Sequence, residues 1–230
     1  MLAAETATWL STIIIIAVLI GVISIGQRAN RADWGGFFSN TIDGWVRLFC
    51  RYYHRFEYEP IPLPEQGGAI IVSNHISGLD PMLIIAACNR PVHFMIAREQ
   101  YLRFGLNWLF RLAGCIPVDR SSRRNDVAFR SALRALSEGK VVALFPQGQI
   151  HHGKEPPPRL KRGVYRLSQL SGAQVYPLHV SGVKGIGYVM RGVILRAHAR
   201  LESCPPVNCA VMTDQECLAV LAKGIRATHH

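Results

Sequence analysis

The stretch AIIVSNHISGLDPMLIIAACN, residues 69–89, contains the pattern that decides the fold. It opens with AIIVSN, a short and mostly apolar run typical of a strand buried on both faces. A glycine-containing turn follows, and Asp80-Pro81 then begins a second apolar run with proline at the first helical position. A buried strand joined by a short loop to a helix predicts the first unit of an α/β domain.

The same alternation continues along the chain. Strands are expected at VHFMIA, CIPVD, VVALFP, QVYPLHVSG and VILRAHARLE, and helices at LNWLFRLAG, DVAFRSALRALSEG, RGVYRLSQLSG and CLAVLAKGI. Gly114 and Gly139 end two of these helices, and Thr213 with Glu216 forms a capping box before the last one. The sequence therefore predicts an α/β fold with a mainly parallel central sheet flanked by helices.

An uncharged apolar run, TATWLSTIIIIAVLIGVISIGQ, lies upstream at residues 6–27. Its most apolar part, Trp9–Ile25, is roughly 25 Å long as a helix, which is the short end of what spans a bilayer. A cleavable signal would open with basic residues, but MLAAETATW carries only Glu5. We expect a retained membrane helix at about residues 8–26, with shallow monotopic insertion as the open alternative.

The chain is basic, with 26 Lys and Arg against 15 Asp and Glu and a formal net charge of +11. Five arginines closely follow the apolar run, at positions 28, 31, 47, 51 and 55. The positive-inside rule therefore places everything after the helix on the cytoplasmic side of the cytoplasmic membrane. Such arginines are attracted to anionic lipid. A nucleic-acid binder would need a recognition helix or stacking aromatics on a basic face, so membrane lipids are the expected partners.

Residues at about 40–56 predict an amphipathic helix, with the arginines opposite an apolar face formed by Trp45, Leu48, Phe49 and Tyr52. This helix is expected to lie on the membrane or against the first helix; an ordinary surface helix is the alternative. The proline-rich segment EPIPLPEQGG predicts a linker at residues 59–68. The expected organisation is a membrane anchor at 1–58, the linker, and a catalytic domain at 69–230.

The six cysteines form no C-x-x-C pair and no zinc-type spacing with histidine. We therefore expect no metal site. Reduced and mostly buried thiols are the expected state in a cytosolic domain.

His75 and Asp80 are the candidate chemical groups. His75 follows the first strand and Asp80 begins the next helix, at the sheet edge where open α/β folds bind ligands. Gly78 eases a tight turn that can fold the carboxylate back onto the imidazole. A carboxylate on one ring nitrogen fixes the tautomer and raises the basicity of the other nitrogen. His75 is thus a candidate general base, although this spacing alone also fits a capping aspartate beside an unrelated histidine.

Further blocks follow in order: GCIPVDR from Gly114 to Arg120, FPQGQI at 145–150, LKRG at 160–163, and the strand VYPLHV. Together with N-H-x-x-x-x-D, which matches Asn74-His75 to Asp80, they resemble the lysophospholipid or glycerolipid acyltransferase family. That family includes the 1-acylglycerol-3-phosphate acyltransferases. The resemblance covers residues 69–206. Counting N-H-x-x-x-x-D as the first block, FPQGQI is the third, and in the family this block usually reads F-P-E-G-T-R.

The resemblance implies an O-acyltransferase of phospholipid synthesis or remodelling. It would transfer a fatty acyl group from acyl-CoA or acyl carrier protein to a lysolipid hydroxyl, with that thioester as co-substrate and no other cofactor. His75 would be the general base and Asp80 its orienting partner. The acceptor would be bound by Arg120, Gln147, Gly148 and Lys161. The motifs would be supported by Asn74, Gly114 and Pro146.

The third block departs from the family pattern at three positions, where Gln147, Gln149 and Ile150 replace glutamate, threonine and arginine. One interpretation is an active enzyme whose acceptor differs from lysophosphatidic acid, such as a glycolipid or an amino-acid lipid. The other is a non-catalytic membrane lipid-binding relative. We favour an active enzyme because a buried imidazole–carboxylate pair rarely serves packing alone.

Overall fold

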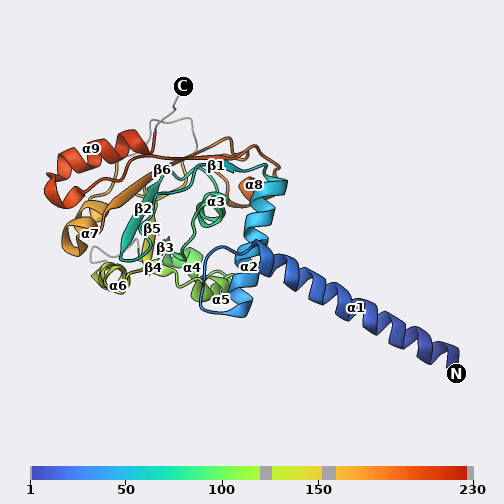
Figure 1. Ribbon diagram of the computed structural model, residues 1–230. Coiled ribbons are helices and arrows are strands. Elements are labelled where there is room, and N and C mark those ends of the chain that lie inside the picture. The colour runs from blue at the N-terminus through green and yellow to red at the C-terminus, as the bar shows by residue number, and fades with distance from the viewer. Residues whose placement is uncertain (1, 120–125, 152–158, 227–230) are drawn as a thin grey trace.

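The computed structural model describes residues 2–119, 126–151 and 159–226. Within these residues, seven strands form one sheet in the order β1-β7-β6-β2-β5-β3-β4 (Figure 1). The strands are β1 (Glu57–Tyr58), β2 (Ala69–Ser73), β3 (Val92–Ala97), β4 (Ile116–Val118), β5 (Val141–Leu144), β6 (Val175–Ser181) and β7 (Arg200–Ser203). Among the described strands every pairing is parallel except that of β6 with β7. The predicted, mainly parallel α/β fold is confirmed.

The helices lie before, between and after these strands. They are α1 (Leu2–Ala29), α2 (Phe37–Leu48) with the π-helical η1 (Phe49–Tyr53), α3 (Asp80–Ala87), α4 (Arg98–Tyr101), α5 (Asn107–Leu112), α6 (Asp126–Ser137), α7 (Gly163–Ser171), α8 (Val189–Ile194), the 3₁₀ turn η2 (Cys209–Val211) and α9 (Asp214–Gly224). The predicted capping box is present, with the Thr213 and Glu216 side chains bonded to each other's backbone N–H groups.

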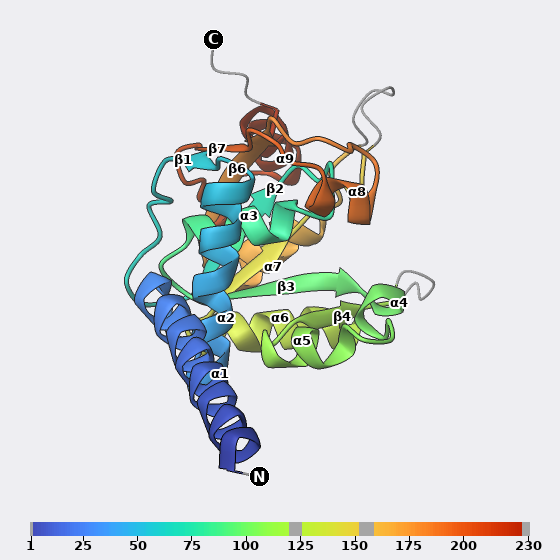
Figure 2. The same ribbon diagram turned by 90° about the vertical axis from the view of Figure 1, so that its right-hand side faces the viewer.

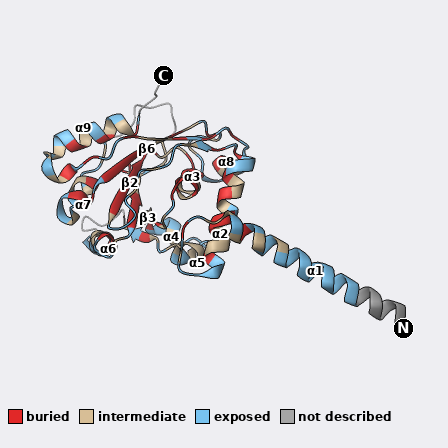
Figure 3. Cartoon of the chain, in the orientation of Figure 1, coloured by how far each residue is buried: buried red, intermediate tan, exposed pale blue. Residues whose placement is uncertain are grey.

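The central strand β2 is buried along its whole length, which is why its sequence is a continuous apolar run. Because successive side chains of a strand point to opposite faces, Ile71 packs in the cluster with Leu83 of α3, and Ile70 packs in the cluster with Leu167 of α7. Helices therefore cover both faces of the sheet, and its strands are the most buried part of the chain (Figure 3).

One predicted strand and the predicted start of the sheet differ from the structure. The expected strand VILRAHARLE is wrong in its first half, because Val193 and Ile194 belong to α8 and the strand is confined to Arg200–Ser203. A short apolar run cannot be assigned to helix or strand by periodicity alone. The sheet also begins earlier than expected, since β1 precedes the linker segment and pairs with β7. The domain boundary at 59–68 stays a prediction.

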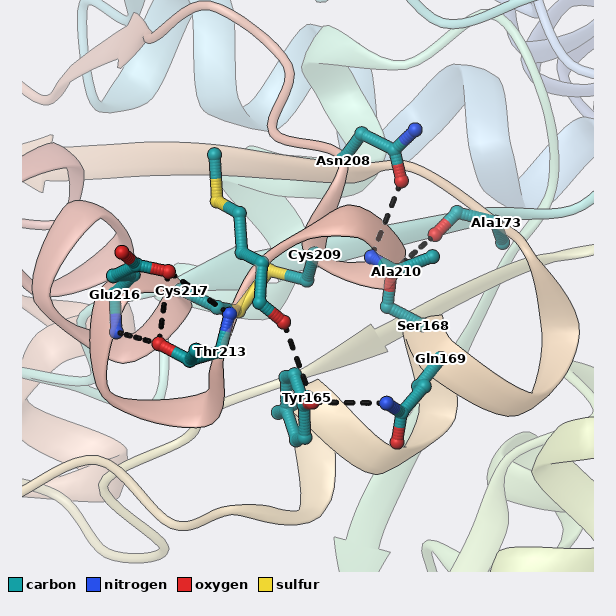
Figure 4. Close-up of a disulfide and its surroundings, with 11 residues drawn as sticks. Tyr165, Ser168, Gln169, Ala173, Asn208, Cys209, Ala210, Thr213, Glu216 and Cys217 are labelled. Atoms are coloured by element: carbon teal, nitrogen blue, oxygen red, sulfur yellow. Dashed lines mark hydrogen bonds between the residues drawn. A yellow bond between two sulfur atoms is a disulfide. The ribbon is translucent and has the colours of Figure 1, made fainter.

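The expectation of six reduced thiols is wrong for one pair. Cys209 and Cys217 form a disulfide, with their Cα atoms 5.3 Å apart, that joins η2 to α9 (Figure 4). The turn between these two elements brings the sulfurs together, a proximity that spacing along the sequence does not reveal. The other four cysteines are free, and burial raises the pKa of Cys50 and of Cys88 to about 12.

The predicted membrane helix is part of α1, which projects away from the sheet with most of its surface exposed (Figures 1 and 3). Residues Trp9–Ala29 are long and apolar enough to cross a membrane. Exposed isoleucines and leucines along 21 residues are unfavourable in water. The apolar surface of α1 therefore suggests that the protein associates with a membrane.

Helix α2 crosses the last turns of α1 at a close contact between glycines. A Cβ atom added to Gly44 would overlap the carbonyl oxygen of Gly26, so the two backbones touch where both side chains are absent. Polar contacts flank the crossing. Trp45 Nε1 donates to Val22 O at 3.1 Å, and Gln27 Nε2 donates to Phe37 O at 2.7 Å. The crossing fixes the direction in which α1 leaves the domain.

Gly44→Ala is expected to force the two helices apart and to lower the free energy of unfolding by about 1–3 kcal/mol, as overpacking does. Thermal unfolding of the full chain in detergent micelles measures the change. Gly21→Ala is the matched control because a Cβ there meets no atom within 4 Å. That control is expected to be neutral or stabilising. Equal stability of the two variants would show that the crossing is loose.

Arg47 corrects the predicted amphipathic pattern. It is buried rather than facing lipid or solvent, and its Nε lies 2.5 Å from Asp43 Oδ2. Its Nη1 donates to Ala86 O at 2.9 Å, and its Nη2 donates to Cys88 O at 2.6 Å. These carbonyls lie at the C-terminal end of α3, where a cation also complements the helix dipole. The arginine therefore links α2 to the C-terminal end of α3.

Candidate active site

His75 and Asp80 meet at the carboxyl end of β2. The loop after Ser73 turns back so that His75 Nδ1 lies 2.8 Å from Asp80 Oδ2, at the start of α3. The side chain of Asp80 is fully buried, whereas that of His75 is 17% exposed. The expected contact is present, and it leaves Nε2 as the ring nitrogen that Asp80 does not engage. The catalytic roles of the two residues stay predictions.

Asp80 is held by three further hydrogen bonds. Its Oδ2 accepts from the N–H groups of Ile76 at 2.7 Å and Ser77 at 2.9 Å, and its Oδ1 accepts from Ser77 Oγ at 2.7 Å. These donors prevent the carboxylate from rotating and so orient it toward the imidazole. Sequence reasoning missed Ser77. A serine three residues before a helix-starting aspartate was the available signal.

The loop that carries His75 is bonded to strand β6 on one side and to the segment that follows β5 on the other. Asn74 Nδ2 donates to Val180 O at 2.8 Å, and its Oδ1 accepts from Val180 N at 2.7 Å, which ties the loop to β6. On the other side, His75 N donates to Gln147 Oε1 at 3.1 Å, and His75 O accepts from His151 N at 2.7 Å. The motif residue Asn74 thus has a structural role, and the backbone of His75 is fixed from both sides.

Phe145 positions the imidazole of His75 by packing against one face of its ring. Its ring stacks on that of His75, with the ring centroids 3.9 Å apart and the ring planes 12° apart. The ring centroid of Phe94, on β3, lies 6.1 Å from that of Phe145. Stacking restricts rotation of the imidazole about its side-chain bonds. The sequence marked Phe145 as part of the third block but did not predict this contact.

The third block and the basic LKRG segment lie together. Gly148 has a φ of +80° in the turn that follows β5, and Gly148 N donates to Phe145 O at 2.9 Å. Lys161 N donates to Pro146 O at 2.9 Å, and a Cβ on Gly148 would lie 2.5 Å from Lys161 Nζ. The ammonium group of Lys161 therefore lies over Gly148, next to the residue whose side chain bonds the backbone of His75.

The other two residues to be placed are Arg120 and Gly114. Arg120 lies outside the described residues. Gly114 precedes β4 with a φ of +61°, and a Cβ there would meet the ring of His93 on β3. Gly114 is therefore at the amino edge of the parallel strands, away from His75, where it allows close packing of a turn.

Open α/β sheets bind ligands at the carboxyl ends of their strands, and this edge here presents an imidazole held by a buried carboxylate. The family model described as Acyltransferase matches residues 55–181, more than half of the chain. The chain belongs to the acyltransferase family.

Two curated relatives are 1-acyl-sn-glycerol-3-phosphate acyltransferases. The protein from Borreliella burgdorferi is 27% identical over 118 residues, and the protein from Bacillus subtilis is 25% identical over 126 residues. These matches cover 50% and 54% of this chain and 46% and 61% of the relatives, so the chain spans about half the length of the curated relatives it matches.

The solved structure of the 1-acyl-sn-glycerophosphate acyltransferase PlsC from Thermotoga maritima shares the fold. Its TM-score with this chain is 0.63 at 18% sequence identity. The similarity covers 84% of this chain and 81% of that one.

Proposed function

We propose that this protein transfers a fatty acyl group from a thioester, on coenzyme A or acyl carrier protein, to the hydroxyl of a membrane lysolipid resembling lysophosphatidic acid. The 2.8 Å contact between His75 and Asp80, at a ligand-binding sheet edge in a chain of this family, is the observation that carries the proposal. Both curated relatives are 1-acyl-sn-glycerol-3-phosphate acyltransferases, which supports the proposed reaction class and acceptor.

In the proposed reaction, His75 Nε2 takes the proton of the acceptor hydroxyl while Asp80 holds Nδ1. The acceptor oxygen attacks the thioester carbonyl, and the carbon–sulfur bond breaks as the new ester forms. The departing thiolate receives the proton from Nε2, so the imidazole returns to its starting state. The acyl thioester is the co-substrate, and no other cofactor takes part in the proposal.

Gln147, Gly148 and Lys161 are the proposed acceptor-binding residues within the described structure. The amide oxygen of Gln147 accepts from His75 N, so a neutral side chain at this position still braces the base. Lys161 is exposed and supplies a positive charge beside Gly148, which suits an acceptor phosphate. Arg120 stays a predicted second phosphate ligand.

Gly148→Ala is expected to raise the KM for a phosphate-bearing acceptor several-fold, because its Cβ would displace the ammonium group of Lys161. Steady-state kinetics with varied acceptor measures this effect. Gly172→Ala is the matched control, since its φ of +68° imposes similar backbone strain but its Cβ meets no atom within 4 Å. An equal change of KM in both variants would indicate that Lys161 does not bind the acceptor.

The deciding experiment is an assay of the purified full chain with a donor and acceptor panel. Acyl-CoA and acyl carrier protein thioesters are each offered with lysophosphatidic acid, other lysophospholipids, a lysoglycolipid and an amino-acid lysolipid. We expect free thiol and acylated lipid in equal amounts, with lysophosphatidic acid as the best acceptor. Turnover restricted to an acceptor without phosphate would favour the glycolipid or amino-acid lipid alternative. Equal lipid binding by wild type and His75→Ala, with no turnover, would establish a binding protein instead.

We also propose that the residues after α1 lie on the cytoplasmic side of the membrane, because several arginines follow this helix in the sequence. Protease added to spheroplasts should spare this part of the chain, and protease added to inverted vesicles should cleave it. The reverse pattern would overturn this orientation.

A further inference from the structure

A group of large apolar side chains outside the His75–Asp80 pair is exposed on the start of α2, on α5 and on the turn that joins α4 to α5. Phe104 is 101% exposed, Phe37 66% and Trp108 53%. We call Phe37, Phe38, Leu102, Phe104 and Trp108 the apolar lobe. Aromatic side chains exposed together in this way mark a contact surface rather than ordinary scattered exposure.

The apolar lobe is continuous with the membrane helix. The rings of Phe38 and Trp108 lie 6.1 Å apart, which joins α5 to α2. Gln27, in the last turns of α1, donates to Phe37 O and to Thr41 Oγ1. Figure 2 shows α5 beside the start of α2, with α1 running out from the same face. A bilayer that receives α1 therefore lies next to the apolar lobe.

The chemistry of the apolar lobe fits a lipid headgroup boundary better than a protein partner. Arg103 and Arg111 are exposed within the same segment and provide positive charge for anionic lipid. Trp108 Nε1 donates to Gly105 O at 3.0 Å, so the indole presents a satisfied polar end and an apolar ring. Tryptophan with these properties is enriched at membrane–water interfaces.

We propose that the apolar lobe inserts into the headgroup–acyl boundary of an anionic bilayer and forms a second membrane contact besides α1. Strand β3 leads directly into α4 at its carboxyl end, and β3 runs parallel to β2 in the same sheet. Insertion would therefore hold the sheet edge that carries His75 close to the lipid surface. This inference does not depend on the reaction, because it concerns only where the surface lies.

A depth measurement on the full chain tests the proposal. An environment-sensitive fluorophore is attached to the thiol of the Phe104→Cys variant. The labelled protein is reconstituted into vesicles of equal parts phosphatidylglycerol and phosphatidylcholine. The phosphatidylcholine bears a nitroxide near the top of its acyl chain, and iodide is the water-soluble quencher. Leu170→Cys, exposed on α7 on the far side of the molecule from α1, is the matched control. Wild type sets the labelling background, which is expected to be low because burial raises the pKa of Cys115 to about 11.

We expect the lipid nitroxide to quench the label at position 104 several-fold more than the label at 170, and iodide to show the opposite order. Equal quenching of both labels by each agent would overturn the proposal. So would a label at 104 that is shielded from iodide but not quenched by lipid, since a second copy of the chain would then cover the lobe. Lower quenching in vesicles of phosphatidylcholine alone would further support the role of Arg103 and Arg111.

Discussion

His75→Ala is expected to lower the rate of acyl transfer by about 10²–10⁴-fold while the protein remains folded. The loss follows from the proposed role of His75, in which Nε2, the ring nitrogen that Asp80 does not engage, takes the proton from the acceptor hydroxyl. The side chain is partly exposed and stacks on a single ring, so its removal leaves the buried core intact. Thiol release from the acyl donor, measured with saturating acceptor, gives the rate.

His93→Ala is the matched control for this loss. His93 lies near the amino end of β3, and burial lowers the pKa of its imidazole, so the folded protein holds it neutral at pH 7. Its removal is expected to leave the rate within a few-fold of wild type. A His75→Ala enzyme that also stays within a few-fold would contradict the proposed base.

Arg47→Ala is expected to lower the free energy of unfolding by about 3–5 kcal/mol, because it leaves the charge of Asp43 buried without its partner. The carbonyls of Ala86 and Cys88 would lose their donors at the same time. Chemical unfolding of the full chain in detergent, followed by circular dichroism, measures the difference.

Arg134→Ala provides the comparison, since Arg134 also pairs with a carboxylate four residues away, Glu138, but on the surface. Exposed pairs of this kind contribute about 0.3–0.5 kcal/mol. If Arg47→Ala were as mild as Arg134→Ala, the link between α2 and α3 would not be important for stability. Replacing Asp43 and Arg47 together by apolar residues should recover part of the loss, because no buried charge then remains.

Much of the fold could be predicted because its signals are local. The elements β2 and α3 and the contact between His75 and Asp80 were predicted from a buried run, a glycine turn and an Asp-Pro helix start that follow one another in the sequence. The capping box before α9 and the apolar run of α1 are local in the same way. These features depend on residues within a few positions of one another.

The remaining features depend on contacts between distant parts of the chain. The sequence placed Arg47 on the polar face of a helix, and only the packing of α2 against α3 shows which carbonyls it reaches. The bond from His75 N to Gln147 joins residues 72 positions apart. The disulfide between Cys209 and Cys217 and the stacking of Phe145 likewise require the folded arrangement. Arg120 stays a sequence-based expectation.

A double-mutant cycle on His75 and Asp80 tests most directly whether the two side chains work as one unit. Acyl-transfer rates are measured for wild type, His75→Ala, Asp80→Asn and the double variant, each checked for folding. If Asp80 acts through the imidazole, the double variant will be no slower than His75→Ala alone, because effects of groups that act together are not additive. Losses that multiply, or an Asp80→Asn enzyme as fast as wild type, would contradict the account.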